Sequence, residues 1–223
     1  MTHRVHPYAH RLGIIRDWKS RWFGTLKGQY QEFLKTDVLL REFLEKRLRG
    51  MYVDTVEMER NQNIYRIIIK TARPGMVIGR SGEGSTKLKA EILAKIQKAK
   101  LTMPREVRVD IEEVKDPESH SAIVAYMIAE GLEKRLPFRR VMKQAMEKTM
   151  QSKGVLGIKV TLSGRLGGAE MGRVESLRLG QVPLQTLRAD IDFAREKAYL
   201  SYGVVGVKVW IYRGEIFNDK AKN

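Results

Sequence analysis

The feature that most constrains the fold is a short glycine-containing segment, Val77–Gly82, which reads V-I-G-R-S-G. Its two glycines, Gly79 and Gly82, allow the backbone to turn tightly and to come close to a partner. An apolar strand pattern precedes the segment, and a helical pattern follows it. Because a helix N-terminus offers free N–H groups and the positive end of the helix dipole, the segment predicts an anion-binding turn centred on Arg80 and Ser81.

The patterns on both sides of this turn predict helices and strands in a defined order. Residues 63–70 and 107–112 have the character of strands, and residues 83–100 repeat apolar side chains at helical spacing. Upstream, residues 36–49 predict a helix and residues 51–59 a strand. The inner face of that first helix is expected to consist of Val38, Leu39, Phe43, Leu44 and Leu48. This order, with a G-x-x-G turn before the second long helix, resembles the prokaryotic (type II) KH domain, whose G-x-x-G loop contacts an RNA backbone.

The same turn is one residue away from a nucleotide-binding P-loop. Residues 79–86 read G-x-x-x-x-G-S-T, and Ser85 stands where the P-loop lysine would reach the phosphates. Without that charge, and without other nucleoside-triphosphate machinery in the sequence, we expect no nucleotide hydrolysis.

The charge of the chain indicates a polyanionic partner. The 223 residues carry a net charge of +16, and 43% of them are apolar, which is enough for real cores. Residues 1–30 hold six basic side chains and one acidic one, and residues 131–180 hold eleven basic and four acidic ones. Residues 31–130 are nearly balanced, with eighteen basic and sixteen acidic side chains. Strong RNA-binding surfaces are therefore expected outside the KH-like region as well. The chain has no cysteine, no apolar stretch long enough for a membrane span and no signal-like apolar segment, so a cytoplasmic protein is expected.

A second domain is expected to begin near Lys115. Asp116 and Pro117 are suited to start a helix, here over residues 118–135, and a second helix is expected over residues 138–152. Strands are expected over residues 155–162, 173–179, 187–193 and 204–212. Helices ahead of a run of strands predict a two-layer α+β domain with the helices packed on a mixed sheet. The chain then divides into a basic tail (1–16), an N-terminal domain with a type II KH fold (17–114, core at about 38–112) and a C-terminal α+β domain (115–223).

The helix over residues 138–152 is predicted to carry cations on one face. Arg139, Arg140 and Lys143 lie within about one turn of each other. Such a run is often a solvated face, but three cations this close repel each other unless an anion is bound. Met142, Met146 and Met150 of the same helix are expected to fill the core. A glycine-rich basic loop over residues 164–173 is expected to let backbone amides and arginines approach a phosphate closely.

Five motifs, spread over almost the whole chain and in the same order, resemble the bacterial small-subunit ribosomal protein three family. They are Arg4–Pro7 with Arg11–Ile14, Thr71–Gly79, Phe138–Lys143, Ser163–Met171, and a C-terminal run from Leu187–Phe193 through Tyr202–Ile211. Five motifs that occur in the family's order along the chain are far more specific evidence than any one of them. The sequence departs from the family at Arg80 and Ser81, where two lysines are common.

The resemblance implies a structural component of the small ribosomal subunit, with no enzymatic activity and no cofactor. It implies binding to 16S rRNA in the lower part of the subunit head, beside small-subunit proteins ten and fourteen. It also implies a place at the mRNA entrance, with small-subunit proteins four and five, where Arg139, Arg140 and Lys143 face the message and support its unwinding. The residues expected to contact RNA elsewhere are Gly79, Arg80, Ser81 and Gly82 of the turn, and Arg4, His6, Arg11, Arg16, Lys19, Arg21, Arg165, Arg173 and Arg178 toward rRNA. The basic tail is expected to be disordered alone and to fold on rRNA.

Two other functions stay open on the sequence alone. A free-standing KH regulator would bind single-stranded RNA with a base preference, whereas the ribosomal interpretation predicts charge-dominated binding with a steep salt dependence. An RNA-processing enzyme would need a nucleophile–base pair or a metal cluster, and the candidate groups have simpler roles. We expect RNA contact or solvent exposure for His3, His6 and His10, and ion pairs for Asp190 and Asp192. For Trp18, Trp22 and Phe23 we expect packing against the KH core, with stacking on an RNA base as the alternative.

Overall fold

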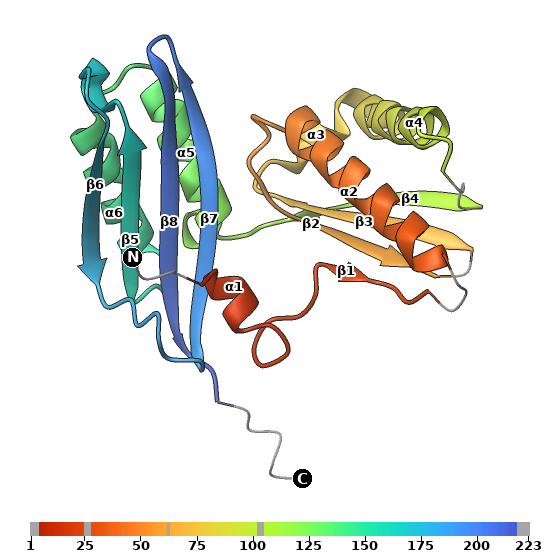
Figure 1. Ribbon diagram of the computed structural model, residues 1–223, viewed down its shortest axis with the longest axis horizontal. Helices are drawn as coiled ribbons and strands as arrows, with labels where there is room; N and C mark the ends of the chain where they lie inside the picture. The colour runs from red at the N-terminus through yellow and green to blue at the C-terminus, as the bar shows by residue number, and fades with distance from the viewer. Residues whose placement is uncertain (1–4, 25–27, 62, 102–104, 218–223) are drawn as a thin grey trace. The chain divides into compact units, whose positions relative to one another are not determined.

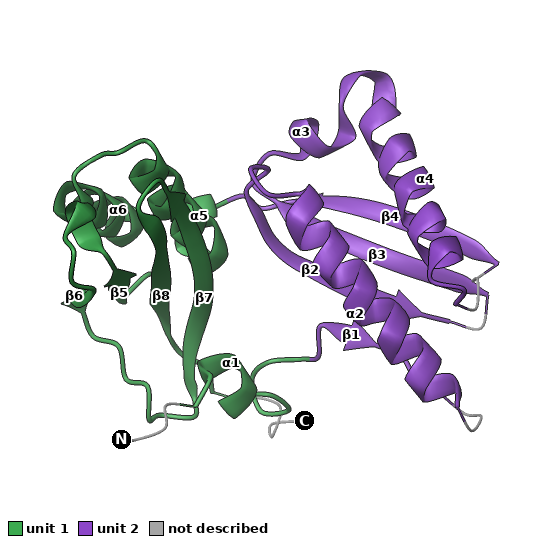
Figure 2. Ribbon diagram, turned by 45° about the horizontal axis from the view of Figure 1, so that its top comes forward, with its two compact units in different colours: residues 1–17, 116–223 green, residues 18–115 purple. Residues whose placement is uncertain are grey.

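The computed structural model describes residues 5–24, 28–61, 63–101 and 105–217, which form two compact units. Residues 18–115 make up one unit (Figure 1 and Figure 2). The rest of the chain, including the N-terminal segment up to residue 17, makes up the other. The described part of the segment expected to be a separate tail, residues 5–16, therefore folds with the C-terminal half of the chain. Each unit combines helices with one four-stranded sheet, so the predicted α+β class is confirmed.

The unit of residues 18–115 is built on a sheet with the strand order β1-β2-β3-β4. Its elements are β1 (Ser20–Arg21), α2 (Gln29–Arg47), β2 (Val53–Arg60), β3 (Ile64–Thr71), α3 (Pro74–Ile78), α4 (Glu83–Lys98) and β4 (Glu106–Glu113). Strands β2 and β3 are antiparallel, whereas β1 pairs with β2, and β4 with β3, in parallel. Helices α2 and α4 pack on one face of the sheet (Figure 2), and Leu40, Leu44, Ile67, Ile69 and Ile92 are buried there.

The buried face of α2 differs from the expected one. Leu44 and Leu48 are buried as predicted, and they continue a row that begins at Leu40. Val38 and Leu39 are 48% and 47% exposed, so the prediction was wrong for both. The reason is geometric, because positions one and two residues before Leu40 lie roughly 100° and 200° around a helix of about 3.6 residues per turn.

The aromatic residues near the start of this unit divide into two kinds. The indole N–H of Trp22 donates a hydrogen bond to buried Asp37 (2.6 Å), and its ring packs edge-on against Phe33. The packing role predicted for Trp22 is therefore confirmed. Trp18 and Phe23 are 63% and 84% exposed, so they do not share that role.

The other unit is built on a sheet with the strand order β6-β5-β8-β7. Its elements are α1 (Pro7–His10), α5 (Ser121–Glu133), α6 (Phe138–Gln151), β5 (Gly157–Gly164), β6 (Arg173–Gly180), β7 (Ala189–Leu200) and β8 (Gly203–Glu215). All three strand pairs are antiparallel, so the prediction of a mixed sheet was wrong. Short connections explain this, because β6 follows β5 and β8 follows β7 without a crossover helix, which parallel neighbours would need.

Helices α5 and α6 cover one face of this second sheet (Figure 1). Met142 and Met146 of α6 are buried against Val160 of β5 and Val209 of β8, and Met150 packs at the edge of the same cluster. The core role predicted for the three methionines is therefore confirmed.

Helix α5 begins later than expected. Asp116 and Pro117 open only a 3-10 turn, Pro117–Ser119, and α5 begins at Ser121. The Asp116 side chain makes no capping hydrogen bond. The first N–H of α5, from Ser121, instead donates to the carboxylate of Asp192 on β7 (2.8 Å). A partner 71 residues away in the chain supplies this bond, so the local sequence contains no signal for it.

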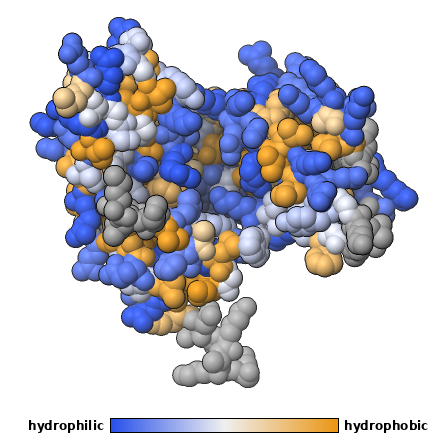
Figure 3. Space-filling view, viewed as in Figure 1, coloured by the Kyte–Doolittle hydropathy of each residue, from blue (hydrophilic) through white to orange (hydrophobic). Residues whose placement is uncertain are grey.

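The surface is mostly hydrophilic in the view of Figure 3, with smaller hydrophobic patches between the polar side chains. Among the described residues we find no helix with the length and apolar character required to cross a membrane.

Candidate nucleic-acid interface

The G-x-x-G turn joins α3 to α4 and exposes its central residues. Gly79 and Gly82 have φ angles of +72° and +82°, in the region that favours glycine, and Ser81 between them has a φ of +50°. Arg80 and Ser81 are exposed. Helix α4 begins directly after the turn, at Glu83, and its N-cap residue, Gly82, provides no side-chain cap. The turn therefore leads into a helix start without a side-chain cap, and such helix starts are where anions bind in many proteins.

Two residues just beyond the turn hold its shape. Gly84 packs so closely on α3 that an added Cβ would lie 2.5 Å from the Val77 carbonyl oxygen. Ser85, at the position of a P-loop lysine, donates a hydrogen bond to the Gly82 carbonyl (2.8 Å) and closes the first turn of α4. Sequence reasoning missed the packing role of Gly84, although a third glycine in G-x-x-G-x-G was a signal for it. Glu83 forms an ion pair with Lys87 (3.4 Å), and Arg80 is the single cation of the turn, so the turn is only weakly basic.

The exposed face of the first sheet is electrically balanced. Arg21 forms ion pairs with Glu57 and Glu59 (2.7 Å each), and Lys70 forms one with Glu57 (2.7 Å). Arg66 continues the network to Glu59 (3.3 Å) and to a carboxylate on β4. Burial raises the pKa of Glu57, but hydrogen bonds from Lys70 and Arg21 outweigh it and leave the pKa below its usual value. The charge of Arg21, a predicted rRNA contact, is therefore largely neutralised within the fold.

Helix α6 carries the predicted cationic face. Arg139, Arg140 and Lys143 are exposed, while Val141 and Met142 are buried on the opposite side. Within the described part of the chain, Arg140 and Lys143 form no ion pair. The helix therefore presents fixed positive charge to solvent.

A carboxylate on the neighbouring strand organises the first turn of this helix. Glu175 of β6 lies 3.4 Å from the guanidinium of Arg139 and 3.6 Å from that of Arg173. Both guanidinium groups also lie 5.6 Å from the centre of the Phe138 ring. Sequence reasoning missed Glu175, because strand register alone brings it beside a helix 36 residues away.

The other basic residues of this unit have different surroundings. Arg165 donates to the carbonyls of Ala169 (2.9 Å) and Tyr202 (3.2 Å), so it braces the glycine-rich loop that it was expected to project toward RNA. Arg173 and Arg178 are both exposed. They lie five residues apart on β6 and therefore point to opposite faces of the sheet.

Arg11 is the clearest departure from the predicted rRNA contacts. Its side chain is completely buried and donates to the carbonyls of Pro7 (3.0 Å), Leu184 (3.0 Å), Thr186 (2.8 Å) and Ala189 (2.6 Å). Burial lowers the pKa of its guanidinium. These bonds fasten the N-terminal segment to the residues before β7, so Arg11 is a folding residue and the prediction of RNA contact was wrong for it.

The remaining N-terminal candidates are placed as follows. Arg4 lies outside the described residues, and Lys19 is half-buried. His6 is exposed, accepts a hydrogen bond at Nδ1 from the backbone of Tyr8 (3.2 Å) and packs edge-on against Phe193. Arg16 forms an ion pair with Asp190 (2.5 Å). The segment is thus ordered on the C-terminal unit, with part of its charge used internally.

The two aspartates of β7 form ion pairs, as predicted. Asp190 pairs with Arg16, and Asp192 pairs with Arg213 (3.2 Å) while accepting the α5 bond described above. Burial raises the pKa of Asp192, but Arg213 and the backbone N–H of Ser121 outweigh it and lower the pKa below its usual value. A carboxylate kept ionised by a cation in this way is a structural group.

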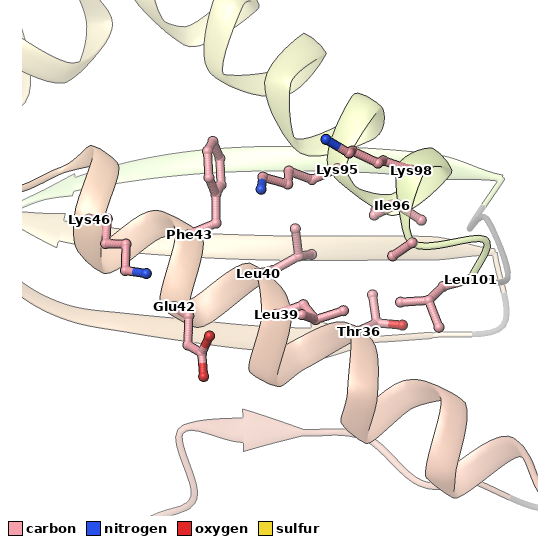
Figure 4. A pocket seen from close by; sticks show the side chains of 11 residues that line it. Thr36, Leu39, Leu40, Glu42, Phe43, Lys46, Lys95, Ile96, Lys98 and Leu101 are labelled. Carbon is pink, nitrogen blue, oxygen red and sulfur yellow. The ribbon is translucent and has the colours of Figure 1, made fainter.

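An apolar groove of about 250 Å³ lies between α2 and the end of α4 (Figure 4). Leu39, Phe43 and Leu101 contribute to its lining, and Lys46 and Lys95 stand at its rim. Leu39, which α2 turns away from the buried row at Leu40, is thus exposed at the edge of this groove.

The comparisons with known proteins agree with this arrangement. Residues 39–119 match the family described as KH domain, and residues 128–211 match the family described as Ribosomal protein S3, C-terminal domain. The fold and the basic helix thus define an RNA-binding protein with a KH domain followed by an S3-type α+β domain.

Curated relatives match over nearly the full length of the chain. A protein of Caldicellulosiruptor bescii is 45% identical over 99% of this chain and 96% of its own length. A protein of Hydrogenovibrio crunogenus is 48% identical over 96% of this chain and 90% of its own length. A protein of Agathobacter rectalis is 46% identical over 99% of this chain and 97% of its own length. All three are named small ribosomal subunit protein uS3. The chain belongs to the uS3 family of small ribosomal subunit proteins, which confirms the predicted resemblance and identifies a ribosomal protein rather than an enzyme.

Proposed function

We propose that this protein is a structural component of the small subunit of the cytoplasmic ribosome. It binds 16S rRNA in the lower part of the subunit head and contacts mRNA at the entrance, where it helps to position and unwind the message. The family supports the ribosomal role. The observation that carries the mRNA contact is the exposed cationic face of α6, formed by Arg139, Arg140 and Lys143.

This face is suited to a strand of arbitrary sequence. Cations on a rigid helix bind phosphates without reading bases, because phosphate contacts carry no sequence information. Arg139 is 70% exposed, so its ion pair with Glu175 is weak and can be exchanged for a phosphate. Translocation moves the message past the helix, so unwinding here requires no nucleotide site.

The wider partner set follows the same proposal. Small-subunit proteins ten and fourteen are its neighbours in the head, and proteins four and five share the mRNA entrance with it. Arg173 and Arg178 are the exposed cations that we assign to rRNA in the C-terminal unit. The G-x-x-G turn is assigned a weaker RNA contact, because Arg80 is its single cation and the surrounding residues 31–130 are nearly neutral.

The α6 contact is tested by the triple variant R139A/R140A/K143A. Ribosomes that contain the variant at full occupancy are expected to translate an unstructured message at the normal rate and to slow at a stable hairpin. The matched control K134A/K148A/K153A removes the same charge from other exposed positions of the helical layer. Normal passage of the α6 variant through the hairpin would remove the mRNA contact from the proposal.

The ribosomal placement is tested separately by sedimentation of the tagged protein from a lysate. Near-stoichiometric migration with the small subunit at moderate and high salt is expected. Migration as free protein or in small RNA complexes would favour a free-standing KH regulator instead.

A further inference from the structure

We propose that the face of the second sheet turned away from α5 and α6 is a separate RNA site, which binds the phosphate backbone of double-helical RNA. The inference rests on the proposed ribosomal function and adds a second side to the C-terminal unit.

Strand register places a group of cations on this face. One row across the sheet consists of Arg178, Lys159, Trp210 and Phe193, and the next consists of Ser176, Thr161, Lys208 and Arg195. A third row adds Lys197 on β7, the edge strand that also carries Arg195. Arg178, Lys208, Arg195 and Lys197 are exposed, and Lys159 is half-buried with its ammonium 5.4 Å from the Trp210 ring.

The face lies opposite the helical layer. Along β5, Ile158, Val160 and Leu162 are completely buried in the core formed with α5 and α6. Lys159 and Thr161 alternate with them and therefore point to the other side of the sheet. A polynucleotide bound there does not compete with one bound along α6.

The charge of this face is not balanced by the fold. Its first two rows hold four cations and no acidic side chain. Within the described residues, Arg178, Arg195 and Lys208 form no ion pair. The exposed face of the KH sheet is the opposite case, because Arg21, Arg66 and Lys70 are all paired there with carboxylates. Unpaired clustered cations imply an anionic partner.

The composition of the face favours double-helical RNA. Single-stranded RNA is usually held by exposed aromatic rings that stack on bases. Within these three rows, Trp210 is only 7% exposed and Phe193 packs between Trp210 and His6, so neither ring is free for stacking; the exposed ring on this side of β7, that of Tyr199, lies beyond the rows, near the end of the strand. The hydroxyl groups of Thr161 and Ser176 lie between the cations and suit phosphate and sugar oxygens. Recognition by backbone contacts alone is how proteins bind duplex RNA largely without reading sequence.

Two-sided binding gives the unit a mechanical role. RNA held on the sheet anchors the domain, and α6 on the other side then presents its cations from a fixed support. A helix that must resist the pull of a moving message benefits from such an anchor.

The test uses the full-length variant R178Q/R195Q/K208Q, which changes three exposed side chains. Fluorescence anisotropy measures its affinity for a short RNA duplex of arbitrary sequence over a range of salt concentrations. Each phosphate contact on a double helix contributes about 0.9 to the steepness of the plot of log affinity against log salt concentration. The plot for the triple variant is therefore expected to be shallower than that for the wild type by about 2.7. For each of the three single variants, the plot is expected to be shallower by about 0.9.

The control K134Q/K148Q/K153Q removes the same net charge from the helical side and is expected to keep the wild-type slope. Unfolding temperatures of both variants are compared with wild type to establish that they fold. A wild-type slope for the sheet variant, or equal losses in both variants, would overturn the inference. Neither result depends on how the α6 variant behaves at a hairpin, so the two proposals fail separately.

Discussion

Replacing Arg11 tests whether a basic residue of the N-terminal segment serves the fold or RNA. The structure predicts that Arg11→Met, which keeps an unbranched apolar side chain and removes the five N–H donors of the guanidinium, destabilises the C-terminal unit. Four backbone carbonyls, those of Pro7, Leu184, Thr186 and Ala189, lose their partner. Because these acceptors are buried or partly buried, water replaces the lost bonds poorly.

The expected loss follows from these bonds. A hydrogen bond from a charged donor contributes about 1.5–3 kcal/mol, and the cost of burying the guanidinium offsets part of the sum. We therefore expect the free energy of unfolding to fall by about 3–5 kcal/mol, the range found when buried charged networks are broken. For a chain of this size, that lowers the unfolding temperature by roughly 6–20 °C.

The measurement is urea unfolding of the full-length protein, monitored by circular dichroism. The control is Arg195→Met, an exposed arginine of the same unit that forms no ion pair with any described residue, and its effect is expected to stay within about 0.5 kcal/mol. Unchanged stability of Arg11→Met together with weaker RNA binding would refute the reasoning and restore Arg11 as an RNA contact.

Three further predictions concern single positions. Asp192→Asn is expected to destabilise the protein at neutral pH, because the wild-type carboxylate is held ionised by Arg213. Folding lowers the pKa of Asp192, so the stability difference from wild type should begin to shrink only below about pH 3.9, the usual pKa of an aspartate in an unfolded chain, as unfolding at a series of pH values would show. Gly84→Ala is expected to cost about 1–3 kcal/mol in thermal unfolding, since its Cβ would meet a backbone carbonyl, while Gly75→Ala, with open space around it, should cost little. Leu40→Ala is expected to cost about 2–5 kcal/mol and exposed Leu39→Ala less than about 1; equal losses would contradict the assigned face of α2.

Most helices and strands were predictable because their signal is local. The alternation of Val107–Glu112 and the helical spacing of Leu88, Ile92 and Ile96 depend on each residue's own neighbours in the chain. The predicted start of α5 failed because its capping partner, Asp192, is distant in sequence. The face of α2 was misjudged because three adjacent apolar residues, at positions 38–40, leave the direction of the core ambiguous.

The sequence by itself determined the α+β class, the KH order of elements, the cationic helix and the excess of positive charge. Only the tertiary structure decided what each cation does. It buries Arg11 among carbonyls, pairs Arg21 with two glutamates, and turns Arg173 and Arg178 to opposite sides of one sheet. The physical reason is that hydrophobic periodicity is a property of neighbouring residues, whereas the partner of a charge is set by strand register and packing between segments far apart in the chain.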